Sequence, residues 1–352
     1  MNINIRGKCI ALIGGSGFIG HNLALELRQQ GADVHVIDSL QVNNLGAFSN
    51  AAGDPNKMLY LHIINERLRL LNQAEVPLHV VDARDYHALS QTLGEIKPQV
   101  VVQLAAIAHA NRSNKDPFTT FDHSFRTLEN ALDCSRGSLG VERFVYFSSS
   151  MVYGNFDNEA VTEDRYCEPM GIYGALKYGG ERLVIAYSQV FKLPYVIIRP
   201  SALYGERCVS RRVGQAFIEN ALRGIPLSVN GNGKDALDFT YIGDLVQGLI
   251  LSIAHPDALN QIFNLTYGDA RTINDMVGIM RSEFPGIQVN YQPRDILMPE
   301  RGTLSVKKAQ RMLGYQPAYP LEKGFVDYIA WYKNLAKQEP KFFSQSANGT
   351  RP

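Results

Sequence analysis

The sequence predicts an α/β fold, namely a doubly wound parallel sheet with helices on both faces and a smaller C-terminal α/β lobe. Short apolar runs rich in β-branched residues alternate with helical patterns as far as residue 198. This alternation is typical of parallel sheets, because each crossover between parallel strands usually contains a helix. A glycine-rich turn joins the first run to the first helix, and beyond residue 199 the pattern changes to short segments rich in glycine and proline.

Each element has its own signal. Short continuous apolar runs are typical of strands that are buried on both faces of a sheet. Such runs predict strands at 8–13, 33–38, 78–82, 100–104, 144–147, 195–198 and 262–265. Helices are expected where apolar residues recur at helical spacing, namely at 18–30, 57–75, 118–135, 173–191, 273–283 and 310–331. The helix at 57–75 lies in an insertion, 42–78, that is longer than an ordinary connection. Packing explains this insertion better than a contact with substrate or with another subunit.

The charge balance and the cysteines narrow the class of protein. The 352 residues include 35 Lys plus Arg and 34 Asp plus Glu, a formal net charge of +1. Proteins that bind nucleic acid or membrane surfaces usually show a basic excess, so we expect neither partner. The 4 cysteines are scattered without a C-x-x-C pair, which argues against a disulfide framework or a metal site. The N-terminus lacks the apolar core of a signal peptide, and no run is long enough to span a membrane, so we expect a cytoplasmic protein.

The turn after the first strand reads GGSGFIG. Its glycines follow G-x-x-G-x-x-G, so the backbone can turn tightly and approach a pyrophosphate at the N-terminus of the next helix. Asp38 ends the second strand, where a carboxylate can accept hydrogen bonds from both ribose hydroxyls and repels a 2′-phosphate. Because Ser39 rather than an arginine follows, NAD is favoured over NADP as the cofactor. Within the turn, cofactor contacts are expected from Gly14, Gly17, Phe18, Ile19 and Gly20.

A serine, a tyrosine and a lysine are candidates for proton transfer. Ser149 and Ser150 follow the strand at 144–147, at the carboxyl end where open α/β sheets bind ligands. Tyr173 and Lys177 are one helical turn apart and share a face. The lysine ammonium can lower the tyrosine pKa, which is ordinarily about 10. With a serine hydroxyl on the same substrate oxygen, the pair could move a proton on or off a secondary alcohol while hydride passes to or from NAD.

These motifs resemble those of the extended short-chain dehydrogenase/reductases, and specifically the NAD-dependent epimerase/dehydratase group that acts on nucleotide sugars. The segments GGSGFIG, VVDARD, LAAIAHA, SSSMVYG, YGALK, RPSALYG and DFTYIGDL occur in the family's order between about residues 8 and 330. The resemblance implies a Rossmann-type NAD-binding domain of residues 1–198 plus about 239–268, with the insertion 42–78. It also implies a substrate-binding lobe of 199–238 and 269–337 and a tail of 338–352.

The resemblance implies roles for single residues. Tyr173 would be the catalytic base, Lys177 would set its pKa and hold the nicotinamide ribose, and Ser149 would be the catalytic serine. Arg294 resembles the arginine that binds the substrate's diphosphate. Further cofactor contacts are implied for Asp82, Ala83, Leu104, Ala105 and Ala106. Asp82 could instead be the N-cap residue at the start of a helix.

The residues after Ser149 distinguish between the reactions of this family. Dehydratases commonly carry Asp-Glu or Ser-Glu there, and decarboxylases usually carry Glu at the position of Met151. Methionine cannot abstract a proton, so the chain resembles the 4-epimerases, which need only reversible oxidation at C4. We therefore expect C4 inversion of a nucleotide-diphosphate sugar through a 4-keto sugar. A dehydratase, a decarboxylase, a reductase and a non-catalytic NAD-binding regulator are the alternatives.

Further substrate contacts are expected from polar residues near the presumed cleft. The ERCVSRR segment supplies three arginines, which suit bidentate contacts to phosphate or else belong to a solvated loop. Ala202 and Leu237 stand where many members of the family carry an asparagine and an arginine that touch the diphosphate. The expected substrate contacts are Ser113, Ser149, Ser150, Tyr173, Arg207, Arg211, Arg212 and Arg294.

Three other residues have a chemical and a structural interpretation. His109 could be an extra acid/base, although a hydrogen-bonded structural role is favoured. Cys167 and Cys208 could each be the second acid/base of a 3,5-epimerase, although a role as small buried side chains is favoured. The helices at 118–135 and 173–191 match those that form a four-helix bundle between subunits in this family, so the resemblance implies a homodimer.

Overall fold

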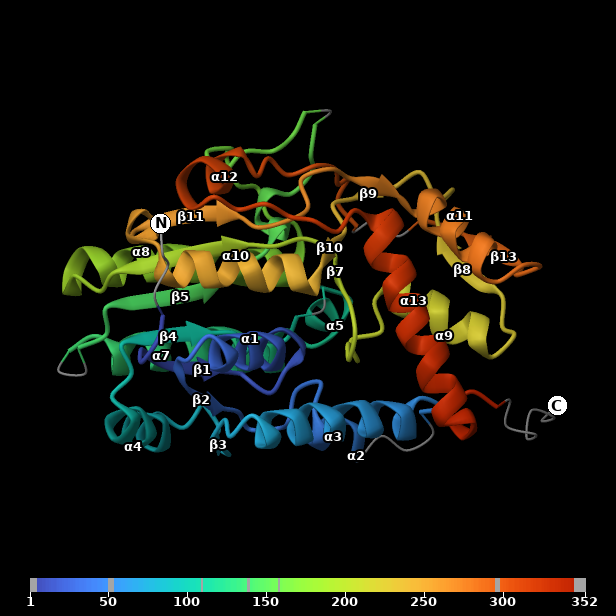
Figure 1. Ribbon diagram of the computed structural model, residues 1–352. Coiled ribbons are helices and arrows are strands. Elements are labelled where there is room, and N and C mark those ends of the chain that lie inside the picture. Colours follow the sequence, from blue (N-terminus) through green and yellow to red (C-terminus); the bar gives the residue numbers. More distant parts are fainter. Residues whose placement is uncertain are drawn as a thin grey trace.

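A seven-stranded parallel sheet forms the centre of the molecule (Figure 1). The computed structural model describes residues 5–49, 54–108, 110–137, 140–157, 159–294 and 298–344. The strand order is β11-β6-β5-β4-β1-β2-β3, and all neighbours are parallel. The strands are β1 (Cys9–Ile13), β2 (Asp33–Ile37), β3 (Leu78–His79), β4 (Val100–Gln103), β5 (Arg143–Phe147), β6 (Tyr195–Arg199) and β11 (Gln261–Asn264). The chain order reverses between β1 and β4, and such a switch point opens a crevice at the carboxyl ends of the strands.

Helices cover both faces of the sheet, as the apolar strands require. Alternate residues of β1 enter different cores: Ile10 and Leu12 pack with α1 and α10, whereas Ala11 and Ile13 pack on the side of α4 and α7. Figure 1 shows α1 and α10 running across the near face. The helices of the two faces are α1 (Phe18–Gln29), α10 (Ile242–Ala254) and α12 (Lys307–Leu313) on one, and α4 (Tyr86–Ile96), α7 (Thr127–Ser135) and α8 (Gly171–Phe191) on the other.

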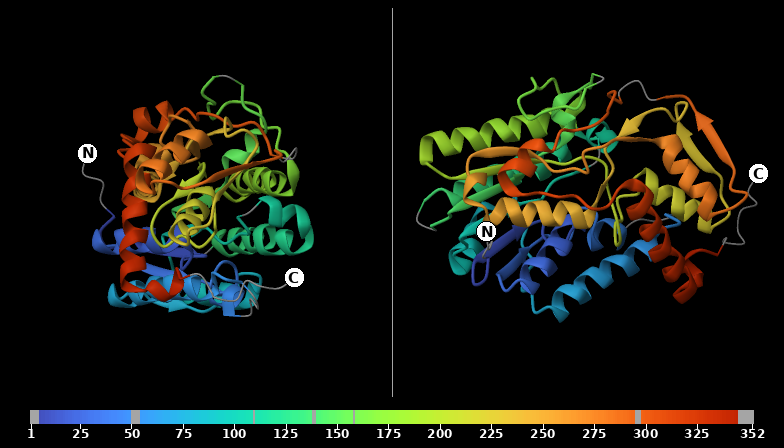
Figure 2. Two further views of the ribbon diagram at one scale, coloured as in Figure 1. Left: turned by 90° about the vertical axis from the view of Figure 1, so that its right-hand side faces the viewer. Right: turned by 45° about the horizontal axis from the view of Figure 1, so that its top comes forward.

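A second apolar core lies beyond one end of the sheet, where Figures 1 and 2 show α13 crossing the molecule. Its helices are α9 (Val213–Leu222), α11 (Ile273–Glu283) and α13 (Leu321–Gln338). Three two-stranded sheets accompany it, formed by β7 (Leu203–Tyr204) with β10 (Thr240–Tyr241), β9 (Ala236–Leu237) with β12 (Arg271–Thr272), and β8 (Leu227–Asn230) with β13 (Val289–Gln292). None of the helices in the described residues is both long and apolar enough to cross a membrane.

The insertion contains α2 (Leu45–Ser49) and α3 (Lys57–Gln73), and α3 joins the two cores. Tyr60, Ile63 and Ile64 on α3 belong to the second core, while Leu71 near its end packs into the core of the sheet. Figure 1 shows α3 running from the β3 edge of the sheet toward α13. The insertion is therefore a packing element, and one of its side chains also reaches a cavity described below.

Three predicted elements differ from the structure. The predicted strand 78–82 is shorter, because β3 is an edge strand that pairs over Leu78–His79 alone. The segment 310–331 divides at Gly314, which ends α12 in a left-handed conformation (φ 70°). The segment 118–135 divides as well. The remaining short helices are α5 (Ala110–Lys115), α6 (Pro117–Phe121), η1 (Asp122–Arg126), η2 (Ser150–Tyr153), η3 (Pro256–Ala258) and η4 (Pro340–Phe342).

Candidate active site

Two cavities meet at the carboxyl ends of the central strands. The larger has a volume of about 490 Å³ and the smaller about 130 Å³. Leu104, Ala106 and Arg212 line both of them, so a ligand in one cavity can contact a ligand in the other. The smaller cavity surrounds the glycine turn, and the larger lies between the sheet and the second core.

The glycine turn has the geometry of a pyrophosphate cradle. Gly14 has a φ of +81°, and a Cβ there would lie 2.5 Å from the Ala105 nitrogen, so this position admits only glycine. Gly17 is the N-cap of α1 and supplies no side-chain cap, which leaves the first N–H groups of α1 to a ligand. All predicted cofactor residues except Lys177 line this cavity, namely Gly14, Gly17, Phe18, Ile19, Gly20, Asp38, Asp82, Ala83, Leu104, Ala105 and Ala106.

Asp38 and Asp82 present different carboxylates to the smaller cavity. Asp38 accepts hydrogen bonds from the backbone nitrogens of Leu40 (2.8 Å) and Ser16 (3.1 Å) and forms no ion pair in the described chain. Both its oxygens retain lone pairs for ribose hydroxyls. Asp82 instead pairs with Arg84, whose Nη2 lies 2.6 Å from its Oδ2. Hydrogen bonds from Arg84 lower the pKa of Asp82, and an adenine amino group would share oxygens that already accept.

Arg67 reaches the smaller cavity from α3, and it is not among the residues predicted from the sequence. Its side chain is fully buried, and its Nε donates to the carbonyl of Arg207 (2.9 Å). Its Nη1 has no hydrogen-bond partner in the structure, although burial of an unpaired donor is unfavourable. Arg67 lies close enough to Asp38 for their charges to interact. A free donor and a free acceptor in one cavity suit the ribose and phosphate oxygens of a dinucleotide.

Ser149, Tyr173 and Lys177 meet in the larger cavity. Ser149 follows β5 and caps η2, while the tyrosine and the lysine lie on α8. The two segments approach closely, because a Cβ on Gly174 would lie 2.8 Å from the carbonyl oxygen of Met151. The Ser149 hydroxyl hydrogen-bonds to the Tyr173 side chain.

The pKa values of the tyrosine and the lysine move in opposite directions. Burial raises the pKa of Tyr173, although the charges of Arg212 and Arg301 and the bond to Ser149 offset part of that rise. Burial lowers the pKa of Lys177 to about 8, and the nearby carboxylate of Glu181 opposes this change. The Lys177 ammonium donates to the Phe147 carbonyl (2.6 Å). Desolvation therefore disfavours the charged form of each group, the phenolate of Tyr173 and the ammonium of Lys177.

A buried ion pair fixes α8 against the sheet. Arg199 at the end of β6 makes two bonds to Glu181 on α8, at 2.9 and 2.6 Å. The same guanidinium donates to the Tyr153 hydroxyl (2.9 Å), and Ser148 donates to Glu181. A bidentate pair with these extra bonds is rigid, so it holds the face of α8 that carries Tyr173 and Lys177 in register with Ser149.

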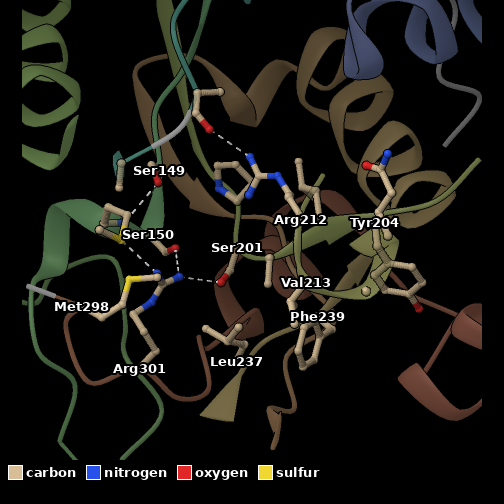
Figure 3. A pocket seen from close by; sticks show the side chains of 18 of the residues that line it. Ser149, Ser150, Ser201, Tyr204, Arg212, Val213, Leu237, Phe239, Met298 and Arg301 are labelled. Atoms are coloured by element: carbon tan, nitrogen blue, oxygen red, sulfur yellow. Dashed lines mark hydrogen bonds between the residues drawn. The ribbon is translucent and has the colours of Figure 1, made fainter. Parts of the chain in front are cut away.

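Arg301 is a second residue that the sequence analysis missed. Its Nη2 donates to the hydroxyls of Ser150 (2.5 Å) and Ser201 (2.8 Å), and its Nη1 contacts the sulfur of Met151 (3.0 Å). Figure 3 shows Arg301 beside these serines at one side of the cavity, with Arg212 opposite. Burial lowers the pKa of Arg301 to about 10, so the guanidinium stays charged at neutral pH.

The predicted arginine cluster divides. Arg211 and Arg212 line the larger cavity, whereas Arg207 lies outside its lining and donates to His21 (3.0 Å) and Asn22 (3.1 Å) on α1. Arg211 approaches Glu219 (3.8 Å), and Arg212 donates to the carbonyl of Ala108 (3.3 Å).

Of the other residues predicted to act at the site, some line the larger cavity and others do not. Arg294 lines the larger cavity and pairs with Asp235 at 3.1 Å. Ser113 is buried in α5, outside the lining of that cavity. Cys208 lines the cavity and Cys167 packs in a separate small cluster. His109 and the end of the tail, 345–352, lie outside the described residues.

Comparison with known proteins identifies the family. Residues 10–266 match the model of the NAD dependent epimerase/dehydratase family. The chain belongs to this family. A relative described as a putative UDP-glucose 4-epimerase, from Methanocaldococcus jannaschii, is 27% identical over 333 residues, which are 92% of this chain and 98% of the relative. UDP-glucuronate 4-epimerase 1 of Arabidopsis thaliana is 25% identical, with 93% of this chain and 77% of the relative covered.

A solved structure agrees in fold. The dTDP-glucose 4,6-dehydratase of Streptomyces venezuelae, solved with NAD bound, superposes with a TM-score of 0.79 at 25% identity and covers 94% of this chain and 99% of that one. The doubly wound sheet predicted from the sequence is confirmed, and NAD is the cofactor. At the level of the family, the protein is an enzyme that acts on nucleotide sugars as an epimerase or a dehydratase.

Proposed function

We propose that the protein is an NAD-dependent nucleotide-sugar 4-epimerase. One observation carries this proposal: the described lining of the larger cavity includes Ser149, Tyr173 and Lys177, but it offers no unpaired carboxylate and no histidine as the second acid/base that elimination of water requires. Among the described residues that line it, Asp235 is the one carboxylate, and it is paired with Arg294. No described histidine lines it, and Met151 stands where family dehydratases commonly carry an acid.

The proton transfers follow from the positions of the three side chains. Tyr173 takes the proton of the C4 hydroxyl while Ser149 hydrogen-bonds the same oxygen, which keeps the C4–O bond aligned. Lys177 stabilises the negative charge that forms on the tyrosine oxygen. When bound, NAD supplies the hydride acceptor and donor at C4. Rotation of the keto sugar and return of the proton from Tyr173 give the inverted alcohol, with no net redox change.

The nucleotide end of the substrate is assigned to the cations at the other walls of the larger cavity. Arg211, Arg212 and Arg294 would bind the diphosphate, because guanidinium groups form bidentate bonds with phosphate oxygens. Ala202 and Leu237 line the same cavity as apolar residues. We take uridine as the nucleotide base, in line with the names of the two sequence relatives.

The test is a product analysis. Purified enzyme is incubated with NAD and with UDP-, GDP-, CDP- and dTDP-sugars, and products are examined by mass spectrometry and proton NMR. We expect a product of unchanged mass with an inverted C4 coupling pattern, and no accumulation of NADH. Tyr173→Phe should abolish turnover. A product lighter by water or by carbon dioxide would instead assign a dehydratase or a decarboxylase, and stoichiometric NADH release would assign a net oxidation.

We also propose that the enzyme is a homodimer through α6 and α8. Large apolar side chains on these helices are exposed in the protomer, namely Phe118, Phe121, Ile172, Val190 and Phe191. Burial of such side chains against a second copy is favourable.

A further inference from the structure

Arg301 is a partly buried cation without a protein counter-ion at the reacting end of the larger cavity. Within the described part of the chain it forms no ion pair, and its Nε has no hydrogen-bond partner. Asp238 lies close enough to interact electrostatically. However, its carboxylate already accepts from Leu304 N (3.0 Å), Gly268 N (3.1 Å) and the Thr266 hydroxyl (2.9 Å). A partly desolvated guanidinium without a partner carboxylate is unfavourable, and a ligand anion would offset that desolvation.

The position of Arg301 selects the part of the substrate that it can reach. It bonds to Ser150, the residue next to Ser149, and its charge acts on Tyr173. These residues surround C4 of the sugar in the proposed reaction. The substituent at C5 is the carbon group nearest to that centre, whereas the diphosphate is attached at C1, across the ring. Arg301 therefore faces the sugar rather than the nucleotide.

The hydrogen-bond directions specify an acceptor. The hydroxyls of Ser150 and Ser201 both accept from Arg301, so each retains its own O–H to donate. Neither hydroxyl donates to another group among the described residues. The cluster thus offers a cation and two hydroxyl donors to the same space, which suits an acceptor with two oxygens and a negative charge. The Nη1 of Arg301 contacts the sulfur of Met151, a side chain that carries no charge to neutralise the guanidinium.

We propose that Arg301, with Ser150 and Ser201, binds a carboxylate on C5 of the sugar, so that the substrate is a nucleotide-diphospho-uronate. This inference rests on the proposed 4-epimerase function, which supplies the orientation of the sugar at Tyr173. Phe156 contributes to the site by packing against the guanidinium, with its ring centre 5.6 Å from the carbon of that group. The hydrogen bond from Leu304 to Asp238 fixes the chain just after Arg301.

The test measures binding separately from turnover. The NAD-loaded Tyr173→Phe enzyme, which cannot react, is titrated by calorimetry with UDP-glucuronate, UDP-galacturonate, UDP-glucose and UDP. We expect a uronate to bind at least tenfold more tightly than UDP-glucose. Adding Arg301→Gln should remove this preference and leave the Kd for UDP within about twofold. Ser201→Ala should weaken uronate binding less, and it keeps the test valid if the arginine variant is unstable.

The control is Arg311→Gln, which changes an exposed arginine on α12 and should leave all four affinities unchanged. An equal loss of affinity for UDP and for the uronates would place Arg301 at the diphosphate and overturn the inference. Equal affinity of the starting enzyme for UDP-glucose and the uronates would also overturn it. In otherwise unmodified enzyme, an equal fall in kcat for both kinds of sugar would assign Arg301 to Tyr173 instead.

The two proposals fail in different ways. If a uronate binds through Arg301 but the product has lost water or carbon dioxide, the carboxylate site stands and the 4-epimerase assignment fails. If an uncharged sugar gives an isobaric C4 epimer and the Arg301→Gln variant shows no change in preference, the epimerase stands and the carboxylate site fails.

Discussion

At the scale of one residue, Lys177 carries a buried charge that is solvated by few protein groups. Its ammonium donates to a backbone carbonyl and lies 5.3 Å from the ring centre of Tyr146, with no carboxylate in an ion pair among the described residues. Burial lowers its pKa to about 8. A lysine with a pKa close to neutrality can respond to the charge of Tyr173, as a general acid–base pair needs. Burying the lysine lowers the stability of the folded protein while the lysine is charged, so the lowered pKa can be measured through the free energy of unfolding.

The first prediction concerns the pH dependence of stability. Between about pH 8, the folded value, and about pH 10.4, the usual value for lysine, the unfolded chain binds a proton on Lys177 that the folded chain does not. Stability therefore rises with pH through this window because of Lys177. The free energy of unfolding of the wild type minus that of Lys177→Met should increase by about 2–3 kcal/mol from pH 7 to pH 10.

Urea denaturation of both proteins at the two pH values measures this difference. Lys337→Met changes an exposed lysine on α13, whose charge remains in water in both states, and its difference from the wild type should stay constant. Parallel stability curves for the wild type and Lys177→Met would show that the lysine is not desolvated as described.

At the scale of elements, α3 connects the insertion to the cofactor cavity. The buried residues of this helix are Leu59, Tyr60, Ile63, Ile64, Arg67 and Leu71. An arginine thus occupies a position where the helical spacing calls for an apolar residue. A charge inside an apolar stripe is a signal that the sequence analysis could have used. The Nη1 of Arg67 has no hydrogen-bond partner, so the guanidinium can donate to a ligand in the smaller cavity.

The second prediction is that Arg67 contributes to NAD affinity. Arg67→Gln should raise the Kd for NAD by about tenfold or more, because it removes a charge-assisted hydrogen bond that is worth roughly 1.5–3 kcal/mol. Calorimetric titration measures the Kd, and a thermal melt measures stability alongside it. Arg69→Gln, an exposed change on the same helix, is the control. An unchanged Kd together with a lower melting temperature would make Arg67 a structural tie to the Arg207 carbonyl only.

The elements also show what could be predicted from the sequence. The strand, turn and helix at 8–30 and the shared face of Tyr173 and Lys177 depend on neighbouring residues, and local spacing reveals them. Arg301 and Ser201 are 100 positions apart and meet only through the packing of the two cores. The contacts of Arg207 with α1 are set in the same way, so a cluster that is continuous in sequence divides in space. Local pattern thus predicted the helix with Tyr173 and Lys177 but not most of the lining of the larger cavity.

At the scale of the whole molecule, the protomer leaves an apolar surface on α8. This helix covers one face of the sheet, and in Figure 1 its labelled end lies at the left, away from α13 and the second core. Ile172, Ala175, Ala186 and Val190 are exposed along it, and Val190 exposes 68% of its surface. On α6, whose residues pack against α8, Phe118 exposes 84%. Small and apolar residues in one stripe allow a second helix to approach closely, and a symmetric pair would bury the same stripe from both subunits.

The last prediction is that a charge in this stripe separates the proposed dimer. Ala186→Arg places a long cation where the partner helix would pack, and it disturbs no internal contact because Ala186 is exposed in the protomer. Light scattering after size-exclusion chromatography should give twice the chain mass of 39.2 kDa for the wild type and a single chain mass for the variant. Ala330→Arg, on an exposed position of α13, should remain dimeric. If the wild type elutes as a monomer, the apolar stripe belongs to a contact with another partner. If the Ala186→Arg variant stays dimeric, the interface lies on another surface.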